Sequence, residues 1–248
     1  MVSIIMAAFN AENTISLAID SVLSQTYKDF ELLVIDDCST DRTINIIGEY
    51  CLADCRIRLF RNNRNHGVSF TRRYGLEKAK GEWIAILDSD DIWERDKLEK
   101  QLQYQGETGA DLVFTGSAFV DLHGSYKKWI LHVPLSIDFR KLLKQNLISN
   151  SSVVVKKEIF IKHYVSEDNL HEDYATWLSI LRDGYSAKAI DEPLLIYRVS
   201  PLSKTGNKLK SAQMNWNTYK YIGLCWIERL YYMGWYMVNG LLKYRHLK

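Results

Sequence analysis

Short apolar runs alternate with amphipathic stretches over the first hundred residues. The runs lack a helical period, which is typical of strands buried on both faces, and they predict strands over residues 2–8, 30–35, 56–60 and 82–87. Between them, apolar residues recur every three or four positions, and we expect helices over residues 13–25, 39–53 and 67–80. Asn13 is the expected N-cap of the first helix, and Ser39 or Thr40 that of the second. Strands that alternate with helices predict an α/β fold with a mostly parallel sheet.

The pattern is looser beyond residue 102. We expect strands over residues 111–120, 129–133, 152–156 and 187–197, the last of them interrupted by Pro193. Helices are predicted over residues 139–145 and 174–181. We interpret this half as the acceptor-facing part of the same domain, with a boundary near residue 100.

Polar side chains follow the first strands at the point where each strand ends. In parallel sheets, ligands bind at the carboxyl ends of the strands, where the strand order reverses. Those ends carry an amide and five carboxylates: Asn10, Asp36, Asp37, Asp88, Asp90 and Asp91. Carboxylates gathered at one edge repel each other unless a cation lies among them. The sequence therefore predicts a site for a cation or a cationic group at this edge.

The acidic motif after the fourth strand has two interpretations. Asp88 and Asp90, spaced i and i+2 in a turn, can converge on a divalent ion and leave positions for phosphate oxygens, as Mg²⁺ prefers. The alternative is a helix N-cap cluster before Ile92. The buried strand before the motif favours the metal.

Other polar residues leave their roles open when each is taken alone. Asp37 can accept a hydrogen bond from a uracil ring or a ribose hydroxyl, or cap a helix. Arg72 can pair with a phosphate or be a solvated helix charge. Asp173 can act as a general base, or it and Glu172 can be first-turn residues favoured by the helix dipole.

Composition excludes several classes of protein. With 248 residues, 47% hydrophobic and 25% charged, the chain has the composition of one packed domain, with or without a small appendage. A net charge of +2 gives no support for nucleic-acid binding. The sequence contains no GxGxxG, no GxxxxGK[ST] and no GxSxG, which argues against dinucleotide binding, a P-loop and acyl transfer. Four cysteines without a CxxC pair, and no predicted signal peptide, indicate a reducing cytoplasm.

The end of the chain differs from the rest. After Ser200 there are eight lysines and arginines against one acid, Glu228. Large apolar residues recur at helical spacing: Trp226, Leu230, Met233, Met237 and Leu241. The nearly uncharged run over residues 230–242 is too short to span a bilayer, which needs roughly 20 residues. An amphipathic helix of this kind can lie on an anionic membrane surface, or pack on the catalytic domain or on a second subunit.

Four segments together carry a resemblance to a known family: VSIIMAAFN, SVLSQTYKDFELLVIDDCSTDRT, NRNHGVSFTRRYGLEKAKGEWIAILDSDD and HEDYATWL. In order and spacing the chain resembles the GT-A family 2 glycosyltransferases, densely over residues 1–100 and more sparsely to about 205. The resemblance implies a GT-A fold: a mostly parallel central sheet flanked by helices, with a Rossmann-like nucleotide-binding half. The implied organisation is a catalytic domain over 1–205, divided into a nucleotide-sugar-binding half (1–100) and an acceptor-binding half (101–205). A basic, aromatic, helical C-terminal region covers 206–248.

The resemblance also implies a UDP-sugar donor and Mn²⁺ or Mg²⁺ as the cofactor. The residues that match its donor-binding positions are Ala8, Phe9, Asn10, Glu12, Asp37, Arg72 and Asp88. Asp37 matches the aspartate that reads the uracil ring, and Arg72 the arginine near the diphosphate. Asp88 and Asp90 match the metal-binding D-x-D pair.

The remaining matches concern the acceptor and the chemistry. Asp173 matches the catalytic base, and Asp91 and Glu172 match positions at the acceptor. Arg198 and Ser203 belong to LIYRVSPLSKTG, which resembles the segment that closes over the diphosphate. Three positions depart from the family pattern: Phe9 replaces a tyrosine, Arg73 an asparagine and Ser200 a histidine.

The resemblance implies an inverting glycosyltransferase that transfers a sugar to a hydroxyl of a saccharide or lipid-linked saccharide, with a β-linkage, in bacterial surface polysaccharide or lipopolysaccharide synthesis. The expected location is cytoplasmic, with contact to the inner membrane through the C-terminal helix, no nucleic-acid partner, and a homodimer left open. The alternatives are a sugar nucleotidyltransferase, disfavoured because AAFNAEN has no glycine, and an inactive nucleotide-sugar-binding protein.

Overall fold

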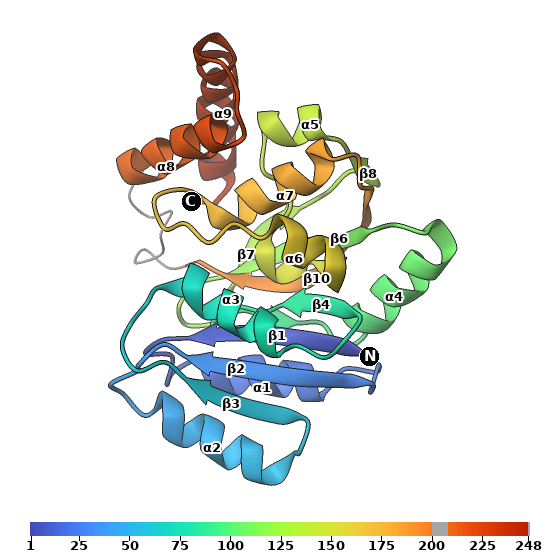
Figure 1. Ribbon diagram of the computed structural model, residues 1–248, viewed down its shortest axis with the longest axis vertical. Helices are drawn as coiled ribbons and strands as arrows, with labels where there is room; N and C mark the ends of the chain where they lie inside the picture. Colours follow the sequence, from blue (N-terminus) through green and yellow to red (C-terminus); the bar gives the residue numbers. More distant parts are fainter. Residues whose placement is uncertain (200–207, 248) are drawn as a thin grey trace.

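The computed structural model describes residues 1–199 and 208–247, which form helices around one mixed sheet (Figure 1). Within these residues the sheet has ten strands, with the order β3-β2-β1-β4-β9-β6-β10-β5, while β7 pairs with β6 and β8 with β10. The first four strands pair in parallel: β1 (Val2–Ala8), β2 (Phe30–Asp36), β3 (Ile57–Arg61) and β4 (Trp83–Ile86). The predicted α/β fold with a mostly parallel sheet and flanking helices is confirmed for this part of the chain.

The sheet continues through the second half of the chain. Its other strands are β5 (Ile92–Trp93), β6 (Leu112–Val120), β7 (Tyr126–Leu131), β8 (Ser136–Ile137), β9 (Val154–Lys156) and β10 (Ala187–Arg198). The short β9 lies antiparallel between β4 and β6 and so joins the two halves edge to edge. The expected interruption of the last strand is confirmed, since the register of β10 shifts between Ile190 and Leu195, around Pro193.

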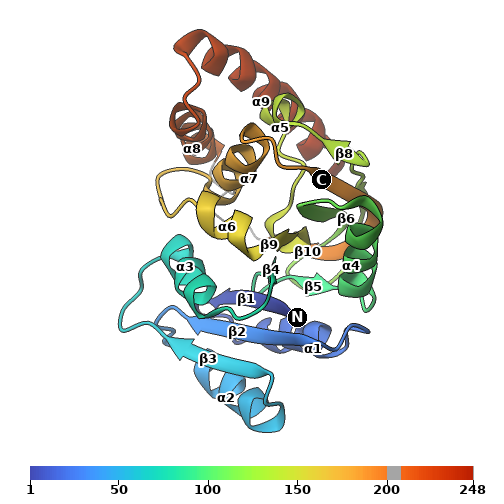
Figure 2. The same cartoon turned by 45° about the vertical axis from the view of Figure 1, so that its right-hand side comes forward.

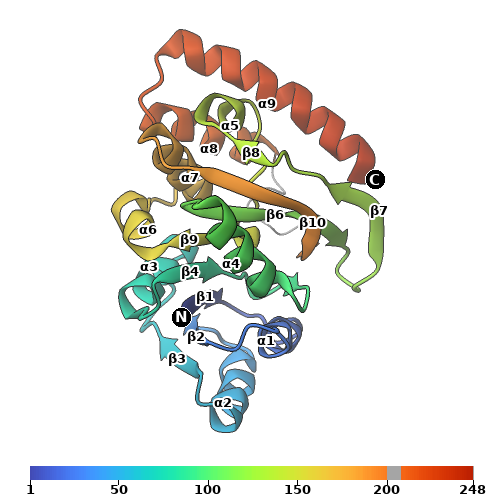
Figure 3. The same cartoon turned by 90° about the vertical axis from the view of Figure 1, so that its right-hand side faces the viewer.

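Alternate side chains of the central strands face two separate layers of helices. Ile4 and Met6 pack with α1 (Ile15–Leu23), α2 (Thr43–Ala53) and α4 (Lys97–Thr108). Ile5, between them, packs with α3 (Val68–Lys78), α6 (Lys157–His163) and α7 (Glu172–Arg182). Figure 3 shows α1 and α3 on opposite sides of β1 and β2. Because helices cover both faces of the sheet, the side chains on both sides of each central strand are apolar, and the strands appear in the sequence as continuous apolar runs.

Two N-caps expected from the sequence are wrong. The helix α1 begins after Thr14, because the Ala11 carbonyl accepts hydrogen bonds from the amides of Thr14 and Ile15 and so places Asn13 in a turn. The helix α2 begins at Thr43, where the Asp41 carboxylate accepts from the Thr43 amide at 3.0 Å. Ser39 and Thr40 do not cap α2 because both bond to Asn10 at the end of β1.

The interpretation of the acidic motif as a helix cap is also wrong. The residues after Asp91 form β5, which pairs with β10, and the next helix, α4, begins only at Lys97. The sequence analysis missed α4 and α6. The helix α7 starts two residues earlier than expected, so Glu172 and Asp173 lie in its first turn.

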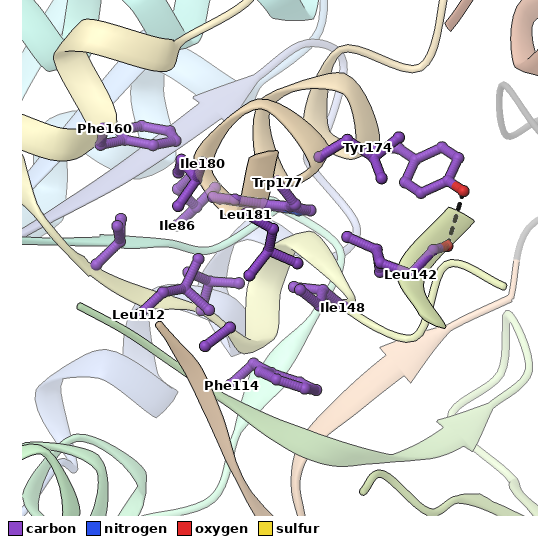
Figure 4. Close-up of a cluster of buried hydrophobic side chains, with 14 of the residues drawn as sticks. Ile86, Leu112, Phe114, Leu142, Ile148, Phe160, Tyr174, Trp177, Ile180 and Leu181 are labelled. Carbon is purple, nitrogen blue, oxygen red and sulfur yellow. Dashed lines mark hydrogen bonds between the residues drawn. The ribbon is translucent and has the colours of Figure 1, made fainter. Parts of the chain in front are cut away.

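The C-terminal region forms α8 (Lys208–Tyr221) and α9 (Trp226–Leu247), which pack beside α5 (Phe139–Lys144) and α7 (Figure 2). Three side chains take the last carbonyls of α5: the hydroxyls of Tyr174 and Tyr219 donate to Leu142 and Leu143, and the Asn239 amide donates to Lys144. Helix C-termini leave such carbonyls without partners in the helix. Figure 4 shows the Tyr174 bond at the edge of the core around Trp177.

The two faces of α9 differ. Tyr232 and Met233 pack against the core, whereas large apolar side chains on the other side are exposed: Trp226, Ile227, Leu230, Tyr231, Trp235, Met237 and Val238. The expected stripe is therefore split, because Met233 faces the protein while Trp226, Leu230 and Met237 face outward. Among the described residues, no helix is both long and apolar enough to cross a bilayer.

Candidate functional site

Three loops with polar side chains meet where the strand order reverses. The strands β1 and β4 are neighbours, and the chain leaves β1 to build β2 and β3 on one side before it returns to β4 on the other. The loops after β1, β2 and β4 carry Asn10, Asp37 and Asp88. The carboxyl ends of parallel strands at such a point form a crevice suited to a ligand.

Asp37 organises the loop that leads into α3. Its buried carboxylate accepts hydrogen bonds from the Asn62 amide at 2.7 Å and from the backbone amides of His66 and Gly67, both at 2.9 Å. Gly67 has φ 85°, a left-handed conformation that glycine adopts without strain. In this structure Asp37 thus anchors the start of α3, and its reading of a uracil ring stays a prediction.

The loop after β1 is held against the loop after β2. The Asn10 side-chain oxygen accepts from the Thr40 amide at 2.9 Å, and the Asn10 amide donates to the Ser39 hydroxyl at 2.9 Å. Both Asn10 (φ 49°) and Cys38 (φ 64°) lie in the left-handed region, which is uncommon outside glycine and often found at functional sites.

The other residues expected at the nucleoside differ in exposure. The ring of Phe9 is 48% exposed and is free to stack, whereas Ala8 is buried. The Glu12 carboxylate accepts from the Arg42 amide at 3.0 Å and so contacts the start of α2.

Arg72 connects the acidic loop to the first turn of α7. Its guanidinium donates to Asp88 at 2.5 Å and to Glu172 at 2.8 Å, and its Nε is buried with no hydrogen-bond partner among the described residues. Burial lowers the pKa of Arg72, but the charges of Asp88 and Glu172 outweigh burial and raise it. The helix α3, which carries Arg72, lies close to the sheet because Gly75 has no side chain. A Cβ at this position would come within 2.5 Å of the Ile35 side chain.

The acidic loop is held from two sides. The Ser151 hydroxyl donates to Asp91 at 2.6 Å and accepts from the Asp88 amide at 3.1 Å. On the other side, the Arg198 amide donates to Asp91 at 3.0 Å, and its guanidinium donates to the Asp90 carbonyl at 3.0 Å. Burial and the charge of Asp88 raise the pKa of Asp90 to about 6, and burial with the charges of Asp90 and Asp88 raises the pKa of Asp91.

The donor chemistry of this loop fits a hard divalent cation. Asp88 and Asp90 offer carboxylate oxygens, and the pKa of Asp90 is raised first by burial and then by the charge of Asp88, both of which a bound cation would offset. Among the described residues there is no group of three or more histidine, cysteine or acidic side chains that could hold a metal. The protein would therefore supply two carboxylates and leave the remaining positions to phosphate and water, as Mg²⁺ prefers.

Asp173 lies in the first turn of α7, next to Glu172, which pairs with Arg72. Burial and then the neighbouring charge of Glu172 raise the pKa of Asp173, against the smaller opposite effects of His171 and Arg72. Its carboxylate accepts from the Tyr174 amide at 2.7 Å. A carboxylate with a raised pKa is a better proton acceptor than an ordinary one.

Three residues expected to contact a ligand bond to other parts of the protein in this structure, and their ligand contacts stay predictions. Asp91 and Glu172, expected at the acceptor, are both buried, and their carboxylates accept hydrogen bonds from Ser151 and Arg72. Arg198 was expected over the diphosphate, but its guanidinium donates to backbone carbonyls, including those of Asp90 and Asp121. The expected contact of Ser203 with the diphosphate lies outside the described residues.

Two residues of this site were not predicted from the sequence. Ser151 holds two members of the acidic loop, and Asn62 links Asp37 to α3 through the Thr71 hydroxyl at 2.9 Å. Ser151 stands in a run of polar residues (SNSS) before β9, and no local feature distinguishes it. For Asn62, its place just after β3 was the available signal.

The chain is similar in sequence to known proteins. Residues 3–170 match the sequence profile described as glycosyl transferase family 2. The chain is 35% identical over 233 residues to the putative teichuronic acid biosynthesis glycosyltransferase TuaG of Bacillus subtilis, covering 94% of this chain and 90% of TuaG. It is 35% identical over 244 residues to WfaP of Escherichia coli, a UDP-Glc:alpha-D-GlcNAc-diphosphoundecaprenol beta-1,3-glucosyltransferase, covering 98% of this chain and 95% of WfaP.

A solved structure supports the fold. The crystal structure of S. aureus TarS, residues 1–349, in complex with UDP-GlcNAc superposes with a TM-score of 0.74 at 16% identity, over 94% of this chain and 70% of that one. At this identity the likeness concerns the fold alone.

Proposed function

Because the chain belongs to glycosyl transferase family 2 and is a glycosyltransferase, we propose that it transfers a hexose from a UDP-sugar to a hydroxyl of a saccharide carried on a lipid diphosphate. The observation that carries the proposal is the bridge made by Arg72, which joins Asp88 of the donor loop to Glu172 beside the proposed base. The name of WfaP, a relative that matches nearly the whole chain, supports this donor and acceptor class.

Asp173 is the proposed general base. Its raised pKa suits it to take the proton from the acceptor hydroxyl. The hydroxyl oxygen forms a bond to the anomeric carbon while the bond from that carbon to the diphosphate oxygen breaks, and UDP departs with the electron pair. One displacement inverts the anomeric carbon, so an α-linked donor gives a β-linked product.

The donor side rests on the crevice at the ends of β1, β2 and β4. We assign the exposed ring of Phe9 to stacking on the base and the loop of Asn10 and Asp37 to the nucleoside. Asp88 and Asp90 would hold Mg²⁺ or Mn²⁺, which when bound offsets negative charge on the departing diphosphate. The side-chain Nε of Arg72, which has no partner among the residues that the structure describes, is assigned as a further donor at this point.

A panel of UDP-sugars tested with an acceptor of GlcNAc on a lipid diphosphate checks this proposal. We expect UDP release with one sugar only in the presence of acceptor and Mn²⁺, and a product that a β-specific glycosidase cleaves. Calorimetry with UDP, with and without Mn²⁺, reports donor binding separately. Failure to bind UDP under both conditions would contradict the assignment, and release of pyrophosphate from a sugar phosphate and UTP would favour the nucleotidyltransferase alternative.

We further propose that the enzyme works at the cytoplasmic face of the inner membrane, with α9 on the lipid surface. Trp226, Ile227 and Leu230 are each more than half exposed on the face of α9 that points away from the protein. The surrounding C-terminal region is strongly basic, which complements anionic headgroups. Four free cysteines suit a reducing compartment.

Flotation with vesicles tests the membrane contact. The wild-type protein should float with vesicles that contain phosphatidylglycerol and much less with pure phosphatidylcholine, and Ile227→Gln with Leu230→Gln should abolish flotation. Leu52→Gln is the matched control, because Leu52 is 92% exposed on α2 at the other end of the molecule (Figure 1). Wild-type protein that stays with the soluble fraction and sediments at twice the monomer mass would instead assign this face to a homodimer.

A further inference from the structure

The residue before the acidic pair of α7 is tied to the C-terminal helices at both its backbone and its side chain. The His171 amide donates to the Thr218 hydroxyl of α8 at 3.1 Å. The His171 Nε2 lies 3.2 Å from the Ser211 carbonyl oxygen, also on α8. Since a carbonyl can only accept, this ring nitrogen carries the hydrogen and donates it.

The contact extends from α8 to α9. The Ser211 hydroxyl lies 3.3 Å from the same His171 nitrogen and 2.9 Å from the Tyr236 hydroxyl of α9. Ser211 and Thr218 are both buried, so water does not compete for these bonds. One side of His171 is therefore fixed by a buried polar contact that runs through two helices.

His171 also defines where α7 begins. It is the N-cap residue, with an extended backbone (φ −81°, ψ 93°), and its carbonyl accepts the first bond of the helix from Ala175 at 2.9 Å. Asp173 follows two residues later. Among the described residues, its side-chain hydrogen bond comes from the adjacent Tyr174 amide, so its direction depends on how the first turn is placed.

From this arrangement we propose that His171 is a positioning residue, which holds the first turn of α7 against α8 so that Asp173 points at the acceptor hydroxyl. The inference rests on the proposed role of Asp173 as the base. It gives the C-terminal helices a part in the reaction besides contact with lipid.

The contact is separable from the packing that holds the helices together. Trp177 and Leu178 anchor α7 in the core, and Tyr174 and Tyr219 fix α7 and α8 to α5. Loss of the His171 ring should leave these contacts in place and loosen the first turn of α7. Small displacements of a catalytic group reduce kcat by as much as about a hundredfold without a matching effect on binding.

The test compares His171→Ala with His171→Gln, whose side-chain amide can still donate to the Ser211 carbonyl. We expect His171→Ala to lower kcat for sugar transfer by about tenfold to a hundredfold, with the Kd for UDP within about twofold of wild type. His171→Gln should recover most of kcat. Ser179→Ala is the matched control, because it removes a buried hydroxyl that bonds only within α7, to the Ala175 carbonyl.

Three outcomes would overturn the inference: wild-type kcat in His171→Ala, a parallel loss of UDP affinity, or equal losses in His171→Ala and His171→Gln. Should His171→Ala fail to fold, Thr218→Val removes the acceptor for the His171 amide with little change of shape, and the same split of kcat from Kd is required. If Asp173→Asn keeps wild-type turnover, Asp173 is not the base. If Asp173→Asn is inactive and His171→Ala is fully active, Asp173 remains the proposed base and only the positioning role of His171 is contradicted.

Discussion

Asp37 and Asp173 lie at opposite sides of the proposed active site and are held in different ways. The Asp37 carboxylate bonds directly to three donors on the short segment between β3 and α3. The position of Asp173 depends on α7, whose neighbours α5, α8 and α9 are supplied by segments far apart in the chain. The donor side is therefore built from local loops, and the base side from long-range packing.

The largest expected effect removes the base. Asp173→Asn keeps the shape of the side chain but cannot take a proton, so kcat should fall by about 10²–10⁴-fold. The donor side does not depend on this carboxylate, and the Kd for UDP should stay within about twofold. Single-turnover transfer and UDP calorimetry measure the two quantities. A parallel loss of both would contradict the separation of the two sides.

The second-largest effect is expected from loss of Arg72, which bridges the donor side and the base side. Arg72→Met removes the buried ion pair between Arg72 and Glu172, and breaking such a pair costs about 3–5 kcal/mol. Chemical denaturation should show this loss in the free energy of unfolding. The double variant Arg72→Met with Glu172→Gln should recover part of this loss, since Glu172→Gln removes the buried negative charge that Arg72 offsets. No recovery would mean that Arg72 acts chiefly through Asp88.

The pH dependence of kcat/KM should reveal the environment of Asp173. Because its pKa is raised and the base must be deprotonated, activity is lost as the pH falls through that raised pKa. The acid limb should therefore lie above the ordinary aspartate value of about 4. A pH-rate profile with a fixed saturating metal concentration measures this limb. Its appearance at or below pH 4 would contradict an Asp173 base.

A smaller effect is expected from the packing on the base side. Tyr219→Phe removes the bond to the Leu143 carbonyl and should lower the free energy of unfolding by about 1 kcal/mol. Tyr104→Phe provides a control, because Tyr104 is half-buried on α4, away from this junction. Urea titrations of both variants measure the difference. Equal stabilities would show that the Tyr219 hydroxyl adds nothing to this junction.

The smallest effect concerns the donor side. Cys38 has φ 64°, where a non-glycine residue is strained, while glycine is not. Cys38→Gly should raise the free energy of unfolding by less than about 1 kcal/mol, since the gain is partly offset by the greater freedom of glycine in the unfolded chain. Thermal unfolding with Cys55→Ala as the control measures it. A clear loss of stability would show that the Cys38 side chain contributes more than its backbone strain costs.

The same contrast explains what could be predicted from the sequence. The strands β1 to β4 and the polar residues at their ends are local patterns, so the fold class and the gathering of Asn10, Asp37 and Asp88 follow from them. The position of β9 between β4 and β6 has no local signal, because three residues carry no period. For the same reason Ser151, which precedes β9, was missed.

Buried pairing was equally hard to foresee. The motifs indicated charged residues near a ligand, but not that Glu172 would be taken by Arg72, or Asp91 by Ser151 and Arg198. Such partners meet only after the chain has folded, and they lie farther apart in the sequence than the length of any of these motifs. The same holds for the exposed face of α9, because the sequence cannot tell which side of an amphipathic helix finds a partner in the protein.

The short helix α5 ends in three carbonyls, each taken by a different later helix. Because these helices share the end of α5, local unfolding of one should destabilise the others. We therefore expect α7, α8 and α9 to unfold as one cooperative unit. Backbone amides in these three helices should then exchange with deuterium at a common rate under native conditions. Truncation within α9 should therefore also speed amide exchange in the first turn of α7, on the far side of the junction.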